Sequence, residues 1–200
     1  MGKCFISQLE TLASRASSSS RKLSLIFISR SQTQLYSTSY SALPLPSIHT
    51  ELASSTQPIL SLPQIVEFLA AAPQKVVLVD NTSSQDVADA YPLVLKHGIN
   101  IVTPNKKAFS GSYRLWKEIF AAATDSGAKV YHESSVGAGL PVISTLKELV
   151  ETGDTVTRIE GVFSGTMSFL FNSFAPTEGS GGKWSAEVSK TTPPETYFAL

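Results

Sequence analysis

Polar residues that could bind a ligand or move a proton follow several separate apolar segments of the chain. Residues 80–84, Asp-Asn-Thr-Ser-Ser, lie at the end of the β-branched segment 75–80 and before a helical pattern. Short side-chain donors and free backbone N–H groups at the start of a helix suit a polar ligand such as a ribose or a pyrophosphate. A plain helix cap by Ser83 or Ser84 has the same local pattern. Both interpretations of this segment stay open on the local sequence.

A second polar segment, Thr-Pro-Asn-Lys-Lys at 103–107, follows the short apolar segment 100–103. A lysine at the end of a strand could donate a proton to a carbonyl oxygen or polarise it. Partial burial beside other cations would lower its pKa towards neutrality, as such work requires. The alternative is that Lys106 and Lys107 are both solvated at the start of a helix.

The third segment, residues 133–141, reads Glu-Ser-Ser-Val-Gly-Ala-Gly-Leu-Pro. Gly-Ala-Gly alone is a weak dinucleotide signal, because a third glycine is missing and Pro141 stands where the helix begins. Glu133 and the carbonyl oxygens of a turning backbone could instead hold a monovalent or hard divalent cation. A tight turn between packed elements explains the same residues without any ligand.

Arg30 stands just after the apolar segment 23–28. In a dinucleotide-binding fold, this position meets the adenosine ribose, where an acid binds the 2′-hydroxyl of NAD and a cation accommodates the 2′-phosphate of NADP. No acid stands at this strand end, so the residue favours NADP, although NAD stays possible. An ordinary loop arginine is the alternative.

Strands and helices alternate at a spacing near 25 residues, which is typical of an α/β protein with a doubly wound, largely parallel sheet. A helix is also expected near the N-terminus, with Phe5, Leu9 and Leu12 on one face, and residues 31–58 are expected to form a loop. Strands are predicted over 23–28, 75–80, 100–103, 129–133 and 155–163. Helices are predicted from Pro63 and over 85–96, 113–123, 141–150 and 166–174.

Composition excludes several classes of protein. The 200 residues carry 16 basic and 16 acidic side chains, so no net charge attracts nucleic acid or an anionic membrane. No segment approaches the roughly 20 apolar residues of a membrane span. The single cysteine, Cys4, and three histidines give neither a disulfide nor a zinc-binding spacing. We expect a cytoplasmic protein; a basic, serine-rich mitochondrial presequence is the alternative interpretation of the first 30 residues.

Four segments together resemble the homoserine dehydrogenase family, and the fungal, monofunctional type most closely. They are V-D-N-T-S-S at 79–84, T-P-N-K-K-A-F at 103–109, Y-H-E-S-S-V-G-A-G-L-P at 131–141 and E-G-V-F-S-G-T-M-S at 160–168. The resemblance implies NAD(P)H-dependent interconversion of aspartate 4-semialdehyde and homoserine, in threonine, methionine and isoleucine biosynthesis. It also implies a homodimer that binds this small-molecule substrate.

The resemblance also assigns site residues. Lys106 is the implied catalytic residue, which transfers a proton at the substrate carbonyl beside the cofactor. The other implied cofactor-binding residues are Gly2, Arg30, Asn81, Thr82, Ser83 and Thr103. The implied sodium ligands are Glu133, Val136, Ala138 and Leu140.

Residues 1–135 match a Rossmann-like NAD(P)-binding domain whose first strand is missing, and Gly2 corresponds to the last glycine of its phosphate-binding turn. Residues 136–200 match the beginning of an α+β substrate and dimerisation domain, in which the resemblance ends near Lys190. The sequence therefore indicates an enzyme of this family truncated at both ends. The alternative is an inactive fragment or a non-enzymatic interaction module of the same family.

Overall fold

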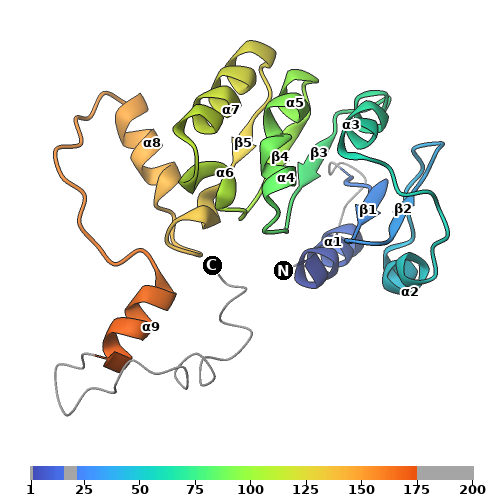
Figure 1. Ribbon diagram of the computed structural model, residues 1–200, viewed down its shortest axis with the longest axis horizontal. Coiled ribbons are helices and arrows are strands. Elements are labelled where there is room, and N and C mark those ends of the chain that lie inside the picture. Colours follow the sequence, from blue (N-terminus) through green and yellow to red (C-terminus); the bar gives the residue numbers. More distant parts are fainter. Residues whose placement is uncertain (1, 16–21, 175–200) are drawn as a thin grey trace. The chain divides into compact units, whose positions relative to one another are not determined.

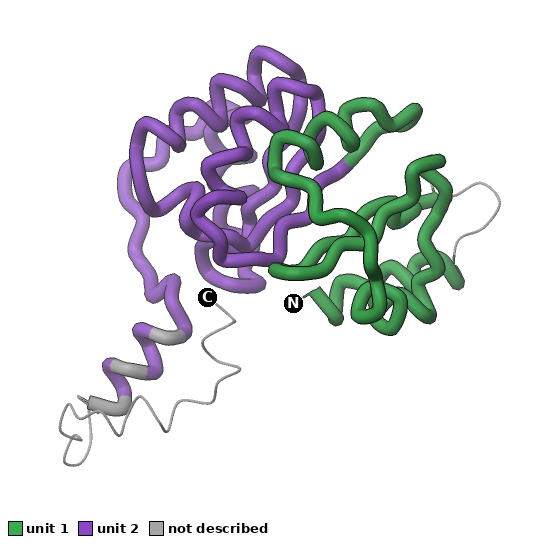
Figure 2. Tube along the Cα trace, turned by 45° about the vertical axis from the view of Figure 1, so that its right-hand side comes forward, with its two compact units in different colours: residues 1–76 green, residues 77–200 purple. Residues whose placement is uncertain are grey.

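Short strands and helices alternate along most of the chain in the computed structural model, which describes residues 2–15 and 22–174 (Figure 1). The chain divides into two compact units, Met1–Val76 and Val77–Leu200 (Figure 2). Within the described ranges, no helix has the length and apolar content needed to cross a membrane.

The second unit contains a three-stranded sheet made of β3 (Val77–Val79), β4 (Asn100–Val102) and β5 (Val130–Tyr131). The strands lie in chain order and all run parallel, with Leu78 opposite Ile101 and Ile101 opposite Val130. Helical segments connect them, as parallel strands require. The parallel α/β arrangement that the alternating pattern predicted is confirmed.

Helix α5 (Tyr91–Lys96) and helix α7 (Tyr113–Ser126) pack on each other, and α5 also contacts β4. Their contact buries the apolar core of this unit, which includes the fully enclosed side chains Tyr91, Leu95, Ile101 and Ile119. Complete burial of a side chain of this size contributes about 1.5–3 kcal/mol to folding. This core fixes the strands whose ends carry the polar segments.

The helix expected over 85–96 is interrupted. It forms two pieces, α4 (Gln85–Asp89) and α5, which meet at Ala90. Pro92 is the physical reason, because it has no N–H to donate to the carbonyl four residues earlier in a continuous helix. Ser84 caps α4 as predicted, with its Oγ accepting from the Val87 N–H at 3.4 Å.

Three more helices belong to this unit, one within the β4–β5 crossover and two after β5. They are the short α6 (Lys107–Ser110), which the sequence did not predict, and α8 (Ile143–Glu151) and α9 (Gly165–Phe174), which it did. The strand expected over 155–163 is wrong: these residues form no regular element. No strand within the described residues lies beside this segment to accept its backbone hydrogen bonds, so its alternating sequence has nothing to pair with.

The first unit begins with helix α1 (Gly2–Arg15), which confirms the predicted N-terminal helix. Ile6 and Leu9 of this helix form a buried cluster with Ile48 of α2 (Ile48–Ala53). Strand β1 (Phe27–Ser29) is shorter than predicted and pairs antiparallel with β2 (Gln34–Tyr36), not parallel as the alternating pattern implied. The two strands are adjacent in sequence, and a tight turn can join only antiparallel neighbours.

The prediction of a loop over 31–58 is wrong, since β2, the 3₁₀ helix η1 (Leu45–Ser47) and α2 all lie there. Glutamine side chains explain how such a short strand is held. The Gln57 amide accepts from the Tyr36 N–H at 2.7 Å and donates to the Tyr36 carbonyl at 3.0 Å. Buried Gln34 bonds to the backbone of Leu60 in the same two-way manner. The two glutamine side chains thus form hydrogen bonds with backbone groups that are distant in sequence, and a local sequence pattern cannot reveal such bonds.

The last helix of this unit, α3 (Leu62–Ala70), begins as predicted, with Pro63 in its first turn. The Ser61 N–H donates to Gln64 Oε1 at 2.9 Å, which closes one half of a capping box. Val66 and Leu69 form its buried face.

Candidate functional site

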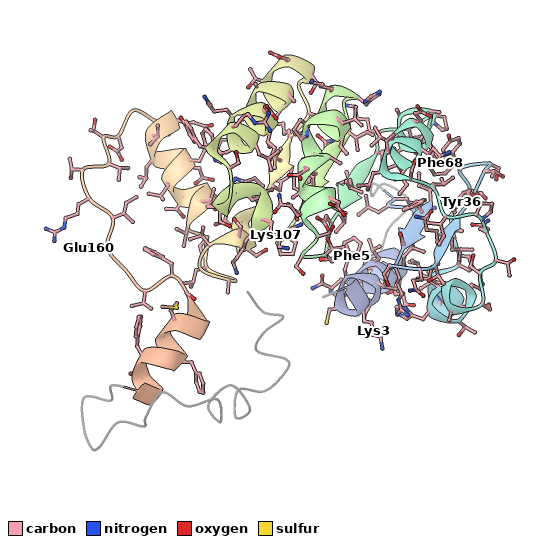
Figure 3. The ribbon with its side chains drawn as sticks, viewed as in Figure 1. Lys3, Phe5, Tyr36, Phe68, Lys107 and Glu160 are labelled. Carbon is pink, nitrogen blue, oxygen red and sulfur yellow. The ribbon has the colours of Figure 1, made fainter. Side chains whose placement is uncertain are left out.

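The loops after β3, β4 and β5 emerge at the same edge of the parallel sheet, because the three strands point in one direction. We call this edge the carboxyl edge and define it by residues 80–84, 103–107 and 132–135. Lys107, at the start of α6, is labelled in Figure 3. In open α/β sheets, ligands bind outside the carboxyl ends of the strands.

Asp80 is the first residue of the carboxyl edge and is only 3% exposed. Its Oδ1 accepts from the Thr82 N–H at 2.7 Å, which bends the loop after β3. Its Oδ2 accepts from the Tyr91 hydroxyl at 2.6 Å and from Asn105 Nδ2 at 3.1 Å. A buried carboxylate is costly unless it is hydrogen-bonded, and these three donors satisfy it.

The loop after β4 is tied to the loop after β3. The Thr103 hydroxyl donates to the Asp80 carbonyl at 3.0 Å and accepts from the Asn105 N–H at 2.8 Å. Asn105 Nδ2 also donates to the Ser84 carbonyl at 2.9 Å. Thr103 and Asn105 are both buried, so the two predicted ligand segments form one hydrogen-bonded structure.

Lys106 follows Asn105 and stands immediately before α6, with a half-buried side chain. Its carbonyl accepts from the N–H groups of Phe109 and Ser110, each at 2.9 Å, so its backbone is fixed. Burial lowers the pKa of the Lys106 amine below its ordinary value. None of the ion pairs among the described residues includes Lys106. The Lys106 side chain is therefore partly buried, which is the environment expected for a lysine that transfers a proton.

The loop after β5 joins the site through aromatic rings. The His132 imidazole stacks on the Phe109 ring, with centroids 4.1 Å apart and planes 17° apart, and meets the Phe120 ring edge-on at 5.8 Å. Burial lowers the pKa of His132, and the Lys147 charge acts in the same direction against an opposing effect of Glu133. Phe109 lies three residues after Lys106, so this contact brings the third loop beside the second.

The Glu133 carboxylate is held by the first turn of α8. Its Oε1 accepts from the Ile143 N–H at 2.8 Å and its Oε2 from the Ser144 N–H at 2.9 Å. Burial opposes ionisation, but these backbone donors outweigh it and lower the pKa of the Glu133 carboxyl. A carboxylate at a helix N-terminus is also favoured by the helix dipole.

The turn between Glu133 and α8 contains the other three predicted cation ligands. Gly137 and Ala138 both have left-handed backbone conformations, with φ of 71° and 52°. The Leu140 carbonyl accepts from the Val142 N–H at 2.9 Å. The carbonyls of Val136 and Ala138 accept no backbone hydrogen bond from the part of the chain that the structure describes. That part also contains no cluster of three or more His, Cys, Asp or Glu side chains able to hold a metal.

Nine predicted site residues thus lie in the loops at or next to the carboxyl edge of one unit, or in the turn that follows. Asn81 is half-buried, and Thr82 and Ser83 are exposed. Gly2 and Arg30 belong to the other unit. Gly2 is the first residue of α1, and Arg30 lies in the hairpin turn, where its N–H donates to the Thr33 carbonyl at 2.8 Å.

Sequence reasoning missed Tyr91, the buried donor to Asp80. The available signal was the acid at the end of an apolar strand: a carboxylate in that place needs donors, and a tyrosine eleven residues later starts a helix that packs on the sheet. Phe109 was also missed, because its partner His132 stands far from it in sequence.

Family comparisons agree with this architecture. The family model described as "Homoserine dehydrogenase, NAD binding domain" matches residues 2–133, and the one described as "Homoserine dehydrogenase" matches residues 141–191. The homoserine dehydrogenase of Paracoccidioides brasiliensis is 65% identical over 122 residues, which are 59% of this chain and 33% of that protein. That of Saccharomyces cerevisiae is 50% identical over 116 residues, 58% of this chain and 32% of that protein.

Solved structures share the fold. A Candida auris protein of unknown function has a TM-score of 0.79 at 38% identity, over 96% of this chain and 52% of that chain. The homoserine dehydrogenase of Thermoplasma acidophilum has a TM-score of 0.58 at 20% identity, over 76% and 45%. The chain spans about a third of the length of the curated relatives that it matches. The sequence resemblance is confirmed, and the chain belongs to the homoserine dehydrogenase family of NAD(P)-dependent oxidoreductases.

Proposed function

We propose that this chain forms the nicotinamide-binding and proton-transferring part of a homoserine dehydrogenase, which interconverts aspartate 4-semialdehyde and homoserine. One observation carries the proposal: a half-buried lysine with a lowered pKa, Lys106, stands at a carboxyl edge built from all three polar loops. This is the edge at which α/β folds bind their ligands. Family membership supports the same substrates.

The carboxyl edge has groups that fit a dinucleotide. Asn81, Thr82 and Ser83 present amide and hydroxyl groups at the surface of the loop, while Asp80 holds that loop from below. Thr103 is 2% exposed and its hydroxyl is used within the loop, so we assign it a supporting role beneath the cofactor. A hyperthermophilic archaeal homoserine dehydrogenase with this fold has been solved in complex with NADPH, which supports the class of cofactor.

Gly2 and Arg30, both in the first unit, are also proposed as cofactor-binding residues, because the family resemblance assigns them this role. The first N–H groups of α1 are of the kind that bind phosphate, and Gly2 leaves them uncovered because it has no side chain. The Arg30 guanidinium suits the 2′-phosphate, so NADP is the proposed cofactor and NAD the weaker one.

Lys106 would act as a general acid towards the aldehyde. The bound nicotinamide supplies the hydride, and the oxygen of the reduced carbonyl then needs a proton. Lowering the pKa of an amine makes its ammonium form a stronger acid, which favours donation near neutral pH. In the oxidative direction, the same neutral amine would accept the proton of the homoserine hydroxyl.

A sodium ion is also proposed, at the turn after Glu133. The carbonyl oxygens of Val136 and Ala138 fit a hard cation, since no backbone N–H in the described residues donates to them. The Glu133 carboxylate fits less well, because both its oxygens already accept from α8. We propose that the carbonyls of Val136 and Ala138 would hold the ion, and that the Leu140 carbonyl would join them through the lone pair that the Val142 N–H leaves open. Glu133 would contribute by ordering the turn.

Family membership also supports proposals on the domains, the oligomeric state and the location of the protein. We propose that residues 1–135 form the NAD(P)-binding domain and that residues 136–200 begin the substrate domain, through which the whole protein would form a homodimer. A cytoplasmic location is proposed with it.

Two assays on the purified chain test the proposed function. NADPH binding is followed by the fluorescence of the cofactor, and homoserine-dependent reduction of NADP⁺ by its absorbance. We expect Lys106→Met to lower turnover by about 10²–10⁴-fold, the usual contribution of a general acid, and to change the Kd for NADPH little. Lys107→Met, at the exposed neighbour, is the matched control. A chain that neither binds NADPH nor reduces NADP⁺ would match an inert fragment and contradict the proposal.

A further inference from the structure

We propose that Asn105 is a positioning residue for Lys106, and that Tyr91 keeps Asn105 in place through the Asp80 carboxylate. The inference rests on the proposed function only for the purpose of Lys106. The connection itself is drawn from hydrogen bonds that join the end of β3, the start of α5 and the end of β4.

The four side chains of this network are nearly inaccessible to water. Tyr91 is 0% exposed, Thr103 and Asn105 are 2% exposed and Asp80 is 3% exposed. Buried polar groups without hydrogen-bond partners destabilise the folded state. Here each has a partner: Asp80 accepts three hydrogen bonds, and the Tyr91 hydroxyl also lies 2.8 Å from Thr103 Oγ1. A network satisfied in this way favours one arrangement of its loops.

Asn105 transmits that arrangement to Lys106. Its Nδ2 donates to Asp80 Oδ2 at 3.1 Å and to the Ser84 carbonyl at 2.9 Å, so its side chain is fixed to the first loop. Its Oδ1 accepts from the Lys107 N–H at 3.2 Å. The single residue enclosed between Asn105 and Lys107 is Lys106, and its backbone direction is therefore set from both sides.

Helix α6 cannot fix Lys106 unaided. It has four residues, and a helix of this length is unstable by itself because nucleation is unfavourable. The Ser110 hydroxyl and N–H donate to the Lys106 carbonyl at 2.9 Å, which orders the helix once Lys106 is placed. Packing of Ala108 and Phe109 holds α6 from its far end, and the hydrogen bonds of Asn105 hold the residues before it.

Tyr91 is suited to a permanent donor role. Burial, and then the hydrogen bond to Asp80, raise the pKa of the Tyr91 hydroxyl far above its ordinary range, so it keeps its proton at every physiological pH. A serine or threonine donor at this place would be too short to span from α5 to the loop after β3.

The test compares Tyr91→Phe with Tyr113→Phe in the full 200-residue chain. Both changes remove one hydroxyl, but Tyr113 is 70% exposed and outside the network. The readout is the pH titration of the Lys106 amine, observed by NMR after isotopic methylation of lysines, with the resonance assigned by Lys106→Arg. We expect Tyr91→Phe to move the Lys106 titration upward, towards that of a solvated lysine. Tyr113→Phe should not move it.

A merely structural role for Tyr91 would lower the melting temperature without moving this titration. A Tyr91→Phe chain that melts cooperatively and keeps the Lys106 titration of the parent would therefore overturn the proposal. If the chain reduces NADP⁺, we further expect kcat to fall about ten- to a hundredfold, as small misplacements do, with KM for homoserine nearly constant. An equal rise in KM with constant kcat would count against positioning.

Two measurements remain decisive if Tyr91→Phe does not fold. The serine in Asn105→Ser keeps a short acceptor for the Lys107 N–H but cannot reach Asp80. This variant should therefore move the Lys106 titration upward, as expected for Tyr91→Phe. Hydrogen exchange on the unaltered chain should protect the Lys107 amide; exchange at the rate of an unstructured peptide would overturn the proposal. Neither the lysine titration nor the hydrogen exchange uses a cofactor, so failure of NADPH binding would count against the proposed function and not against this network.

Discussion

The Phe109 ring covers one face of the His132 imidazole, with their centroids 4.1 Å apart and their planes only 17° apart. This contact joins the segment that carries Lys106 to the segment that carries Glu133. Through it, the third loop of the carboxyl edge is held by packing, whereas the first two are held by hydrogen bonds.

Replacing Phe109 with leucine should weaken the packing between residue 109 and the His132 imidazole. We expect Phe109→Leu to destabilise the chain by about 1–2 kcal/mol, from lost burial and lost aromatic contact. Because burial lowers the pKa of His132, the variant should also raise that pKa towards its ordinary value. Urea unfolding and an NMR titration of the imidazole measure the two effects.

Phe169→Leu is the matched control for Phe109→Leu, since Phe169 lies on α9 and is 40% exposed. It should change neither stability nor the His132 titration appreciably. Equal destabilisation by the two variants would show that the Phe109 ring has no special contact.

The Glu133 carboxylate stabilises the first turn of α8 in a pH-dependent way. Its pKa is lowered in the folded chain, so its contribution is complete above the unfolded value of about 4.3 and is lost as pH falls through the folded value. Glu133→Gln should therefore cost about 1 kcal/mol at neutral pH, as loss of a helix cap does, and progressively less in acid. Urea unfolding at several pH values measures it.

Glu151→Gln removes a charge from the other end of the same helix, where Glu151 forms an exposed pair with Lys147. Exposed pairs of this kind contribute little. We expect almost no effect at any pH. A Glu133→Gln chain as stable as the parent at neutral pH would refute the capping role.

Gly137 combines a left-handed backbone with close packing. Its φ is 71°, and a methyl group there would lie 2.9 Å from Val142 Cγ2. Gly98 has a φ of 74° but open space around it. Gly98→Ala should cost about 1 kcal/mol from backbone strain alone, and Gly137→Ala clearly more.

Combining Gly137→Ala with Val142→Ala separates the two contributions. Removing the Val142 methyl groups should bring the added cost of Gly137→Ala down to that of Gly98→Ala, measured by thermal unfolding of all the variants. An unchanged cost in the Val142→Ala background would rule out the contact as its cause.

Arg30 sets the proposed preference for NADP. Reversing its charge with Arg30→Glu should weaken NADPH binding about tenfold, from the loss of one charge-assisted hydrogen bond to phosphate, while NADH binding changes little. Lys22→Glu makes the same charge change nearby and serves as the control. Equal weakening of NADPH and NADH would contradict a contact with the 2′-phosphate.

Local sequence was sufficient for the parallel strands and for the polar segments at their ends. The β-branched residues 77–79 and 100–102 could be placed because a buried parallel strand is almost continuously apolar. The same logic predicted Lys106, Asn81 and Glu133 as site residues, since each follows such a strand. The break at Ala90 was not predicted, although Pro92 stands inside the helical pattern and could have indicated it.

Other features depend on contacts between distant residues. Strand β2 is held by the side chain of Gln57, 21 residues from Tyr36. The Tyr91 hydroxyl meets the Asp80 carboxylate only because α5 packs in the core. The Asn105 side chain donates a hydrogen bond to Asp80, which lies 25 residues earlier in the chain. Conversely, residues 155–163 have an alternating pattern but no neighbouring strand within the described structure. In each of these cases the structure depends on a partner that is distant in sequence. The local sequence pattern does not show whether such a partner is present.

Titrating NADPH into the ¹⁵N-labelled chain tests the central claim most directly, because backbone amide shifts report where the cofactor binds. We expect saturable shifts at Thr82, Ser83 and Lys106, with the amides around Arg158 and Glu160 unaffected. Saturable binding that leaves residues 80–84 and 103–107 unperturbed, or no binding at millimolar NADPH, would contradict a nicotinamide site at the carboxyl edge.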